Sequence, residues 1–344
     1  MIEIDGSQKS GSGTILRLSV ALAAITKQSL HIYNIRQNRP QSGLKHQHLE
    51  AVLTAAKLSN AKLKGATLGS RELWFTPQKI EGGNIEAEIQ TAGSIPMLLL
   101  ATLPICLFAD NAVRLHVAKG GTDTIHAPTI NYMRYILLPT LKQMGVDATL
   151  TVQKYGYYPK GMGEATMIVK PNHKLKPIQL QNFGNVKSIN GVSICTFLAD
   201  REVAERQAKA AEEYLSKNGY GVNVEVINDE SNFFQKGSSI VLWAETNTGL
   251  IIGADAIGEL RKMSEAVGKE AAEKLLTELS FEPTVDIYLA DMLIPYMALT
   301  SGKSVFLVRT ISEHIESNIW LMEKMLNLKF TIQKENKLYR IEKS

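Results

Sequence analysis

The sequence has few cysteines and no long apolar run, and each of these absences excludes a class of protein. The chain of 344 residues has only two cysteines, Cys106 and Cys195, which stand far apart in apolar runs. Neither a disulfide framework nor a thiolate zinc site is predicted, because both need several suitably spaced cysteines. The most apolar stretch, 95–109, contains two prolines and is shorter than the roughly 20 residues that span a bilayer. We therefore expect a buried helix there and no insertion into a membrane.

The N-terminus also lacks the basic and apolar segments of a secretory signal, since residues 1–5 lead directly into a Gly/Ser-rich loop. With so few cysteines, this start predicts a cytoplasmic protein. Composition excludes other classes: apolar residues make up 44% and charged residues 21%, the proportions of a globular protein rather than a disordered or fibrous one.

Negative charge is missing from one stretch. The whole chain carries a net charge of only +4, yet no acidic residue occurs between Gly6 and Leu49. The same stretch holds six cations, namely Lys9, Arg17, Lys27, Arg36, Arg39 and Lys45. A local field of this kind attracts phosphate groups even when the net charge is small.

The hydrophobic periodicity alternates between strand and helix patterns, which predicts an α+β, α/β-like body built from repeated units. Residues 185–279 form a separate pattern, in which a strand precedes an amphipathic helix at 201–218 and further strands follow. We therefore expect a large domain of residues 1–184 and 280–344, with a smaller α/β domain inserted at 185–279.

A loop from Gly6 to Gly13 lies between the first predicted strand and helix. Glycines allow a ligand to approach the backbone, and the free N–H groups of a helix start favour an anion. The loop is not a Walker motif, because no Gly-Lys-Ser/Thr closes it, and Leu16 stands where G-x-G-x-x-G needs its last glycine. A flexible turn would look the same, but Arg17, one turn into an apolar helix, needs an acidic or phosphate partner.

Arg36 and Arg39 lie on one short loop that Pro40 and Gly43 stiffen. Two guanidinium groups held in this way suit bidentate phosphate binding, although a solvated basic loop would have the same sequence. The absence of nearby carboxylates favours the phosphate. His46 and His48 are two residues apart, so on a helix they point in different directions and are not predicted to share a metal.

Near the C-terminus, Ser312 is predicted to cap a helix whose first turn contains His314. An isolated histidine is more often a surface or packing residue, so by itself His314 is only a candidate nucleophile.

Together with five other motifs, however, this segment resembles the RNA 3'-terminal phosphate cyclase family. The similar motifs, in chain order, are DGSQKSGSGTILR, RQNRPQSGLKHQH, TAGS, GGTDTIHAP, GYYPKGMGE, and YLADMLIPYMAL with the later histidine. The resemblance implies a large domain of three units, each with two helices on a four-stranded sheet, and a smaller inserted domain.

The resemblance also implies a reaction. A histidine, which His314 matches, would take AMP from ATP in the presence of a divalent metal, Mg or Mn. The AMP would pass to an RNA 3'-phosphate, and the neighbouring 2'-hydroxyl would then close a 2',3'-cyclic phosphate. ATP and an RNA with a 3'-phosphate end are thus the expected partners, and the oligomeric state is left open.

The family's functional positions carry over residue by residue. Arg17, Arg36 and Arg39 match positions that hold the triphosphate or the RNA phosphate. Pro128 and Tyr288 match the two faces that enclose adenine. The other positions that match nucleotide-binding ones are Gln47, Leu100, Leu289, Ala290, Asp291 and Met292.

This sequence departs from the family pattern at several positions. Ser10 stands where the family has a glutamate implicated in metal contact, so the metal ligands stay unassigned, and Lys9, which replaces a glycine, is a hypothetical substitute cation. Leu100 and Met292 replace glutamines, and Met162 replaces the middle glycine of a three-glycine run.

Three alternative functions remain. The first is a non-catalytic, RNA-binding relative in ribosome assembly, a branch that lacks the histidine. The second is another nucleotidyl transfer at the same site. The third, judged from the fold alone, is an enolpyruvate-type transferase.

Overall fold

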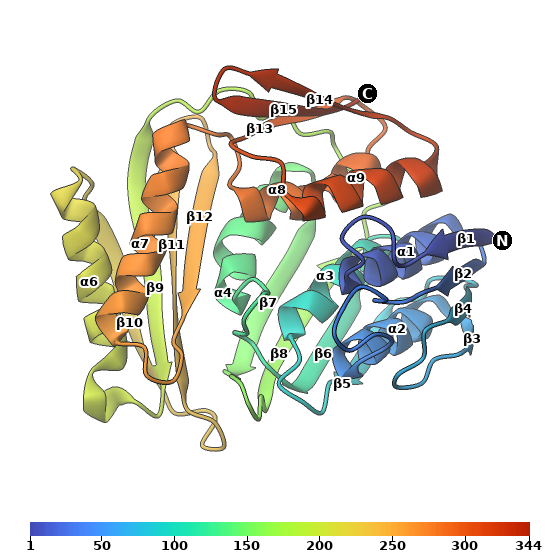
Figure 1. Ribbon diagram of the computed structural model, residues 1–344, viewed down its shortest axis with the longest axis horizontal. Coiled ribbons are helices and arrows are strands. Elements are labelled where there is room, and N and C mark those ends of the chain that lie inside the picture. Colours follow the sequence, from blue (N-terminus) through green and yellow to red (C-terminus); the bar gives the residue numbers. More distant parts are fainter.

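The computed structural model describes residues 1–344 and contains four sheets with helices packed against them (Figure 1). Three of the sheets belong to three similar units. Unit 1 consists of β1 (Ile2–Asp5), α1 (Gly13–Thr26), β2 (Leu30–Tyr33), α2 (His46–Ser59), β3 (Lys62–Lys64) and β4 (Leu73–Thr76). Unit 2 consists of β5 (Gly83–Glu88), α3 (Ile95–Cys106), β6 (Val113–Gly120), α4 (Ile130–Tyr132), the π-helical turn η1 (Met133–Leu137), α5 (Leu138–Gln143), β7 (Asp147–Lys154) and β8 (Gly163–Lys170).

Units 1 and 2 share one strand topology. Their sheets have the orders β1-β2-β4-β3 and β5-β6-β8-β7, so in both units the fourth strand lies between the second and the third. The first two strands of each unit are parallel because a helix crosses between them, and the remaining pairs are antiparallel. The repeated α+β architecture predicted from the sequence is confirmed.

Unit 3 has a reduced version of the same sheet. It consists of α8 (Ile287–Ala298), β13 (Ser304–Val308), α9 (Glu313–Leu326), β14 (Phe330–Glu335) and β15 (Leu338–Lys343), with the order β13-β15-β14. The place of its first strand is taken by a single parallel bridge between Gln179 and Val305. The next N–H group that faces the partner strand, that of Ile178, donates to the Ser304 hydroxyl instead of a backbone carbonyl, and this sheet has three strands rather than four.

A further segment follows this bridge. It consists of β9 (Val186–Thr196), the 3-10 turn η2 (Ala199–Arg201), α6 (Val203–Lys217), β10 (Val222–Asp229), β11 (Gly237–Thr246), β12 (Ile251–Ile257) and α7 (Ser264–Phe281). The sheet order is β10-β9-β11-β12, and α6 and α7 cover its outer face (Figure 1). The chain then returns to unit 3 at α8.

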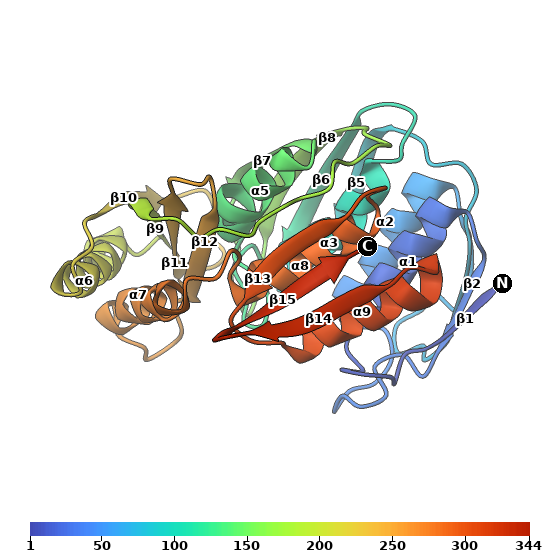
Figure 2. The ribbon, with the colours of Figure 1, turned by 90° about the horizontal axis from the view of Figure 1, so that it is seen from above.

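The segment from β9 to α7 has a core of its own. Sixteen buried residues, among them Ile189 and Leu275, form a cluster between its sheet and its helices. The opposite face of the sheet contributes Val192 and Val241 to the main core of 75 residues. Seen from above, this segment lies to one side of the three units (Figure 2). On this basis we propose that residues 185–279 form a domain inserted into a larger one of residues 1–184 and 280–344.

Two helices illustrate how the sequence sets the local structure. The stretch 95–109 was expected to form a buried helix, and α3 is indeed buried on nearly all sides. The sequence of residues 129–144 predicts a helix, and in the structure η1 interrupts it, because Pro139 lacks the N–H that would continue regular helical bonding. No helix of the protein combines the length and the apolar character that crossing a membrane requires.

Candidate active site

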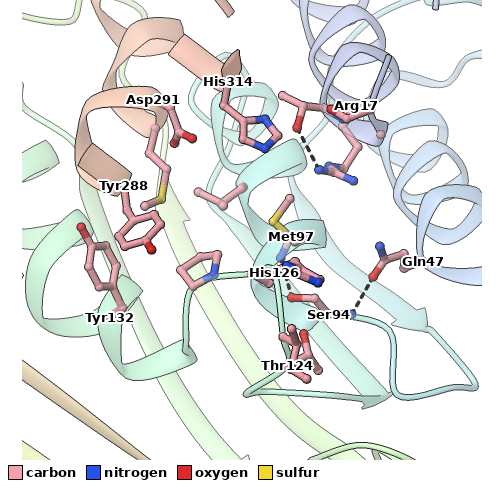
Figure 3. Close-up of a pocket in the computed structure, with 18 of the residues that line it drawn as sticks. Arg17, Gln47, Ser94, Met97, Thr124, His126, Tyr132, Tyr288, Asp291 and His314 are labelled. Carbon is pink, nitrogen blue, oxygen red and sulfur yellow. Dashed lines mark hydrogen bonds between the residues drawn. The ribbon is translucent and has the colours of Figure 1, made fainter. Parts of the chain in front are cut away.

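A cavity of about 780 Å³ lies where α1, α3, α8 and α9 face β12 and α7 of the inserted segment (Figure 3). It collects most of the residues singled out from the sequence: Arg17, Arg36, Arg39, Gln47, Leu100, Pro128, Tyr288, Asp291, Met292 and His314. Leu289 and Ala290 do not line it, because they lie on the core side of α8 and are almost completely buried. Ser10 also lies outside the lining.

Three helices begin at the wall of this cavity. Ser12, Ser94 and Ser312 are the N-caps of α1, α3 and α9, and each side chain accepts a hydrogen bond from a first-turn backbone N–H. The predicted cap of α9 is thereby confirmed. The remaining N–H groups and the positive ends of the helix dipoles favour an anion between them.

Arg17 is a buried cation without an acidic partner. Its side chain is only 7% exposed, and its hydrogen bond to the hydroxyl of Thr14 is long, at 3.4 Å. Burial, with the charge of Arg36 adding to it, lowers the pKa of Arg17 to about 10. Keeping an unpaired guanidinium in such a place is costly, so an anion in the cavity would relieve a strain that the fold itself creates.

Arg36 and Arg39 differ in how they are held. Arg36 is buried and donates through Nη1 to the carbonyl oxygens of Gln41 and Gly43, both at 2.8 Å, so part of its guanidinium fastens its own loop. Burial and the charge of Arg39 lower the pKa of Arg36. Arg39 itself is exposed at the cavity. The cavity thus receives one buried, one anchored and one open arginine.

His314 is the second residue of α9 and projects into the cavity opposite Arg17 (Figure 3). Burial lowers the pKa of its imidazole, the charges of Arg17 and Arg39 lower it further, and Glu313 opposes them. The ring is therefore neutral at neutral pH and keeps a lone pair for nucleophilic attack.

The apolar side chains that line the cavity include Leu100, Pro128, Tyr288 and Met292. Asp286 sets the start of α8 here, since its carboxylate accepts hydrogen bonds from the backbone N–H groups of Tyr288 and Leu289 and from the Tyr132 hydroxyl. An aromatic ring beside apolar side chains suits the face of a nucleobase.

Gln47, the second residue of α2, connects the start of that helix to the start of α3. Its Oε1 accepts a 2.8 Å hydrogen bond from the backbone N–H of Ser94, the cap of α3 (Figure 3). The amide nitrogen of Gln47 stays available as a donor toward the cavity. This residue therefore positions α3 as well as lining the site.

Asp291 lies between these two regions, and burial together with the charge of Asp286 raises its pKa to about 8. Between pH 4 and pH 8 the folded protein holds a proton that the unfolded chain has released, so ionisation of this group destabilises the fold as pH rises. We expect Asp291→Asn to raise the melting temperature, with a gain that grows from pH 5 to pH 8. Thermal melts at both pH values check this.

The control for this prediction is Asp200→Asn, which removes an exposed carboxylate on η2. It is expected to change the melting temperature equally at both pH values. A gain for Asp291→Asn that does not vary with pH would contradict the assignment of a raised pKa to this group.

Several residues of the cavity were missed by sequence reasoning. His48 is buried beside Arg17, its Nδ1 has no hydrogen-bond partner, and burial and that charge lower its pKa to about 2. The site needs glycine at position 13, because a Cβ there would lie 2.2 Å from Nε2 of His48. Lys262 and Lys274, which both pair with Glu270, reach the cavity from the inserted segment. Only the tertiary fold brings these residues to the site.

The residues present do not fit a metal ion held by the protein alone. No three side chains of His, Cys, Asp or Glu cluster in a way that could hold one. Ser10 is occupied by other hydrogen bonds, because its N–H donates to Ser317 and its hydroxyl to Ser12. Lys9 is exposed and lies outside the cavity lining, which gives no support to its role as a substitute cation.

Fold and site together define a class: an α+β protein of repeated units that assembles unpaired arginines, helix N-termini and a neutral histidine around one cavity. A family model described as RNA 3'-terminal phosphate cyclase matches residues 8–332. The RNA 3'-terminal phosphate cyclase of Pyrococcus furiosus is 41% identical over 333 residues, covering 97% of this chain and 95% of that protein. Its namesake from Methanosarcina barkeri is 42% identical over 347 residues, with 100% of both chains covered.

The chain therefore belongs to the RNA 3'-terminal phosphate cyclase family, a family of enzymes. The resemblance seen in the sequence motifs is confirmed. A third relative with the same name, from Methanopyrus kandleri, is 40% identical and covers 97% of this chain.

Proposed function

We propose that this protein uses ATP to convert an RNA 3'-phosphate into a 2',3'-cyclic phosphate. The observation that carries the proposal is the position of His314, a neutral histidine that faces a buried and unpaired Arg17 in the cavity. The full-length similarity to proteins named RNA 3'-terminal phosphate cyclase supports it. A location in the cytoplasm is part of the proposal, consistent with two free, buried cysteines.

ATP binds first, with its base between Pro128 and Tyr288 and its phosphates toward the arginines and the starts of α1, α3 and α9. The lining supports this orientation, because it contains both apolar side chains around Tyr288 and the three arginines. Arg17, Arg36 and Arg39 would then stabilise the charge that develops on the phosphoryl groups. A divalent metal would add charge neutralisation at the triphosphate, and no residue of this chain is assigned to hold it.

In the first step a ring nitrogen of His314 attacks the α-phosphorus of ATP. A bond forms between nitrogen and phosphorus, the bond from the α-phosphorus to the bridging oxygen breaks, and pyrophosphate leaves with those electrons. The neutral imidazole has the lone pair that this attack requires. Burial lowers the pKa of this imidazole, and the charges of Arg17 and Arg39 disfavour its protonation further.

In the second step an oxygen of the RNA 3'-phosphate attacks the same phosphorus and the bond to His314 breaks, so that AMP is transferred to the RNA end. In the third step the 2'-hydroxyl attacks the RNA phosphorus, loses its proton and displaces AMP, which closes the cyclic phosphate. A phosphate dianion is a poor electrophile, and the anhydride to AMP provides the leaving group that it lacks.

The test uses two oligonucleotides that share a sequence and a 3'-phosphate and differ only in the terminal 2'-hydroxyl. With ATP and magnesium, we expect the RNA terminus to become resistant to phosphatase and to lose the mass of one water. The 2'-deoxy terminus cannot form the ring, so by the same steps it stops at the anhydride and gains AMP instead of losing the mass of one water. Tight binding of the RNA without conversion, with several divalent metals, would instead favour the non-catalytic RNA-binding relative.

A further inference from the structure

A group of large apolar side chains is exposed outside the cavity. Tyr158 is 78% exposed, Phe233 70% and Phe234 50%. The rings of Phe233 and Phe234 lie 4.0 Å apart between centroids, with an angle of 31° between their planes. Aromatic residues clustered on a surface commonly mark an interaction site.

These rings are carried by two loops that fasten each other. The loop between β7 and β8 holds Tyr158, and the loop between β10 and β11 holds the two phenylalanines (Figure 1). Asn232 is 1% exposed, and its side-chain amide donates to the carbonyl oxygens of Tyr155 and Gly161 at 2.6 and 3.0 Å. The exposed rings therefore stand on a preformed base, which reduces the ordering cost of binding a ligand.

Charge on the same loops favours an anionic ligand. Lys160 and Lys236 are exposed and take part in no ion pair of this structure. Two acids are near: Glu230 is exposed, whereas Asp229 accepts hydrogen bonds from Thr196 and Ser231. We call Tyr158, Lys160, Phe233, Phe234 and Lys236 the aromatic ledge.

Short stretches of backbone connect the ledge to residues that line the cavity. β11 begins at Gly237, shortly after Phe234, and its Ser239 is paired in register with Ile257 of β12, which lines the cavity. On the other side, Gly156 donates its N–H to the hydroxyl of Thr122, two residues before the cavity-lining Thr124. In Figure 1 the two loops lie together at the lower edge of the molecule.

We propose that the aromatic ledge binds the unpaired bases of a single-stranded RNA whose 3' end occupies the cavity. This rests on the proposed function, which places a phosphorylated RNA end beside His314. Exposed aromatic rings flanked by lysines are the elements that proteins use to hold single strands without sequence preference, because every base has a face that can stack. The inserted segment would thereby contribute to RNA binding through Phe233 and Phe234.

The test is fluorescence anisotropy with labelled single-stranded RNAs of two and twelve nucleotides, each with a 3'-phosphate or a 3'-hydroxyl end. The double variant Phe233→Ala/Phe234→Ala is expected to bind both twelve-nucleotide RNAs about tenfold more weakly, which corresponds to the loss of one stacked base. Binding of the dinucleotides is expected not to change. Phe233→Tyr/Phe234→Tyr should restore the affinity, and Leu68→Ala, an exposed apolar residue of unit 1, is the control.

Unchanged affinity of the double variant for the twelve-nucleotide RNAs would overturn the proposal. So would a double variant that dissociates from a second copy of this chain while its RNA affinity is kept, because the ledge would then be a protein contact. Failure of the proposed function would be seen in a different measurement, namely a wild-type protein that forms no cyclic product. Binding to the ledge does not depend on that reaction, because it is also measured with RNAs that end in a 3'-hydroxyl.

Discussion

His314→Ala is expected to abolish labelling of the protein by ATP that carries a radioactive α-phosphate. The label should stay on the wild-type chain through denaturing electrophoresis, because the proposed intermediate joins AMP to the imidazole covalently. Cyclisation of a 3'-phosphorylated RNA is expected to fall by a factor on the order of a thousand or more, as happens when a covalent nucleophile is removed.

The control is His46→Ala, which removes an exposed histidine outside the cavity and should leave labelling unchanged. His314→Asn keeps a polar side chain at the start of α9 and is expected to lose the label as the alanine variant does. Equal melting temperatures of these proteins would show that the loss is chemical. A labelled His314→Ala protein would mean that the nucleophile lies elsewhere, which contradicts the proposed role.

Arg17→Met is expected to have two opposite effects. Without ligand, the variant should be more stable, with an unfolding free energy higher by about 1–3 kcal/mol, because a buried cation without an acidic partner is removed. With ATP, labelling should become slower by about a hundredfold or more, because the phosphates lose a buried guanidinium. Chemical denaturation and the initial rate of labelling measure the two effects.

Arg309→Met provides the matched control for the stability measurement. Arg309 is paired at 2.8 Å with Glu278, whose side chain is only 5% exposed, so its removal leaves a buried carboxyl without a partner. This variant is expected to be less stable than the wild type, which is the opposite sign to Arg17→Met. If both variants were destabilised alike, the idea that Arg17 is held in a strained, unpaired state would be wrong.

The arginines and the histidine of the site could be predicted from the sequence, because each is recognised from its immediate neighbours in the chain. Arg17 is a charged residue in an otherwise apolar helix, and Ser312, two residues before His314, is a residue type that caps helices and so predicts the start of α9. For the segment predicted to bind the nucleotide, the sequence did not separate the residues that line the cavity from those that do not. Asp291 and Met292 line the cavity, whereas Leu289 and Ala290, on the same run of residues, face the core, because successive residues on a helix point in different directions.

Other features depend on contacts between distant segments. β3 of unit 1 is only the three residues Lys-Leu-Lys, which carry little strand signal of their own, and its pairing with β4 stabilises it. The first strand of unit 3 is likewise missing because the chain around Gln179 forms only one bridge, to Val305. Neither could be predicted from periodicity within one stretch.

By itself the sequence determined that this is a repeated α+β protein with a basic, acid-free N-terminal stretch, and its motifs identified the family. Those properties depend on residue type and on spacing along the chain. Only the tertiary structure decided that Arg17 is buried without a partner, that His48 packs against Gly13, and that Asn232 joins the two loops that carry the aromatic ledge. Burial, unpaired charge and adjacency are set by segments far apart in the sequence, which only folding brings together.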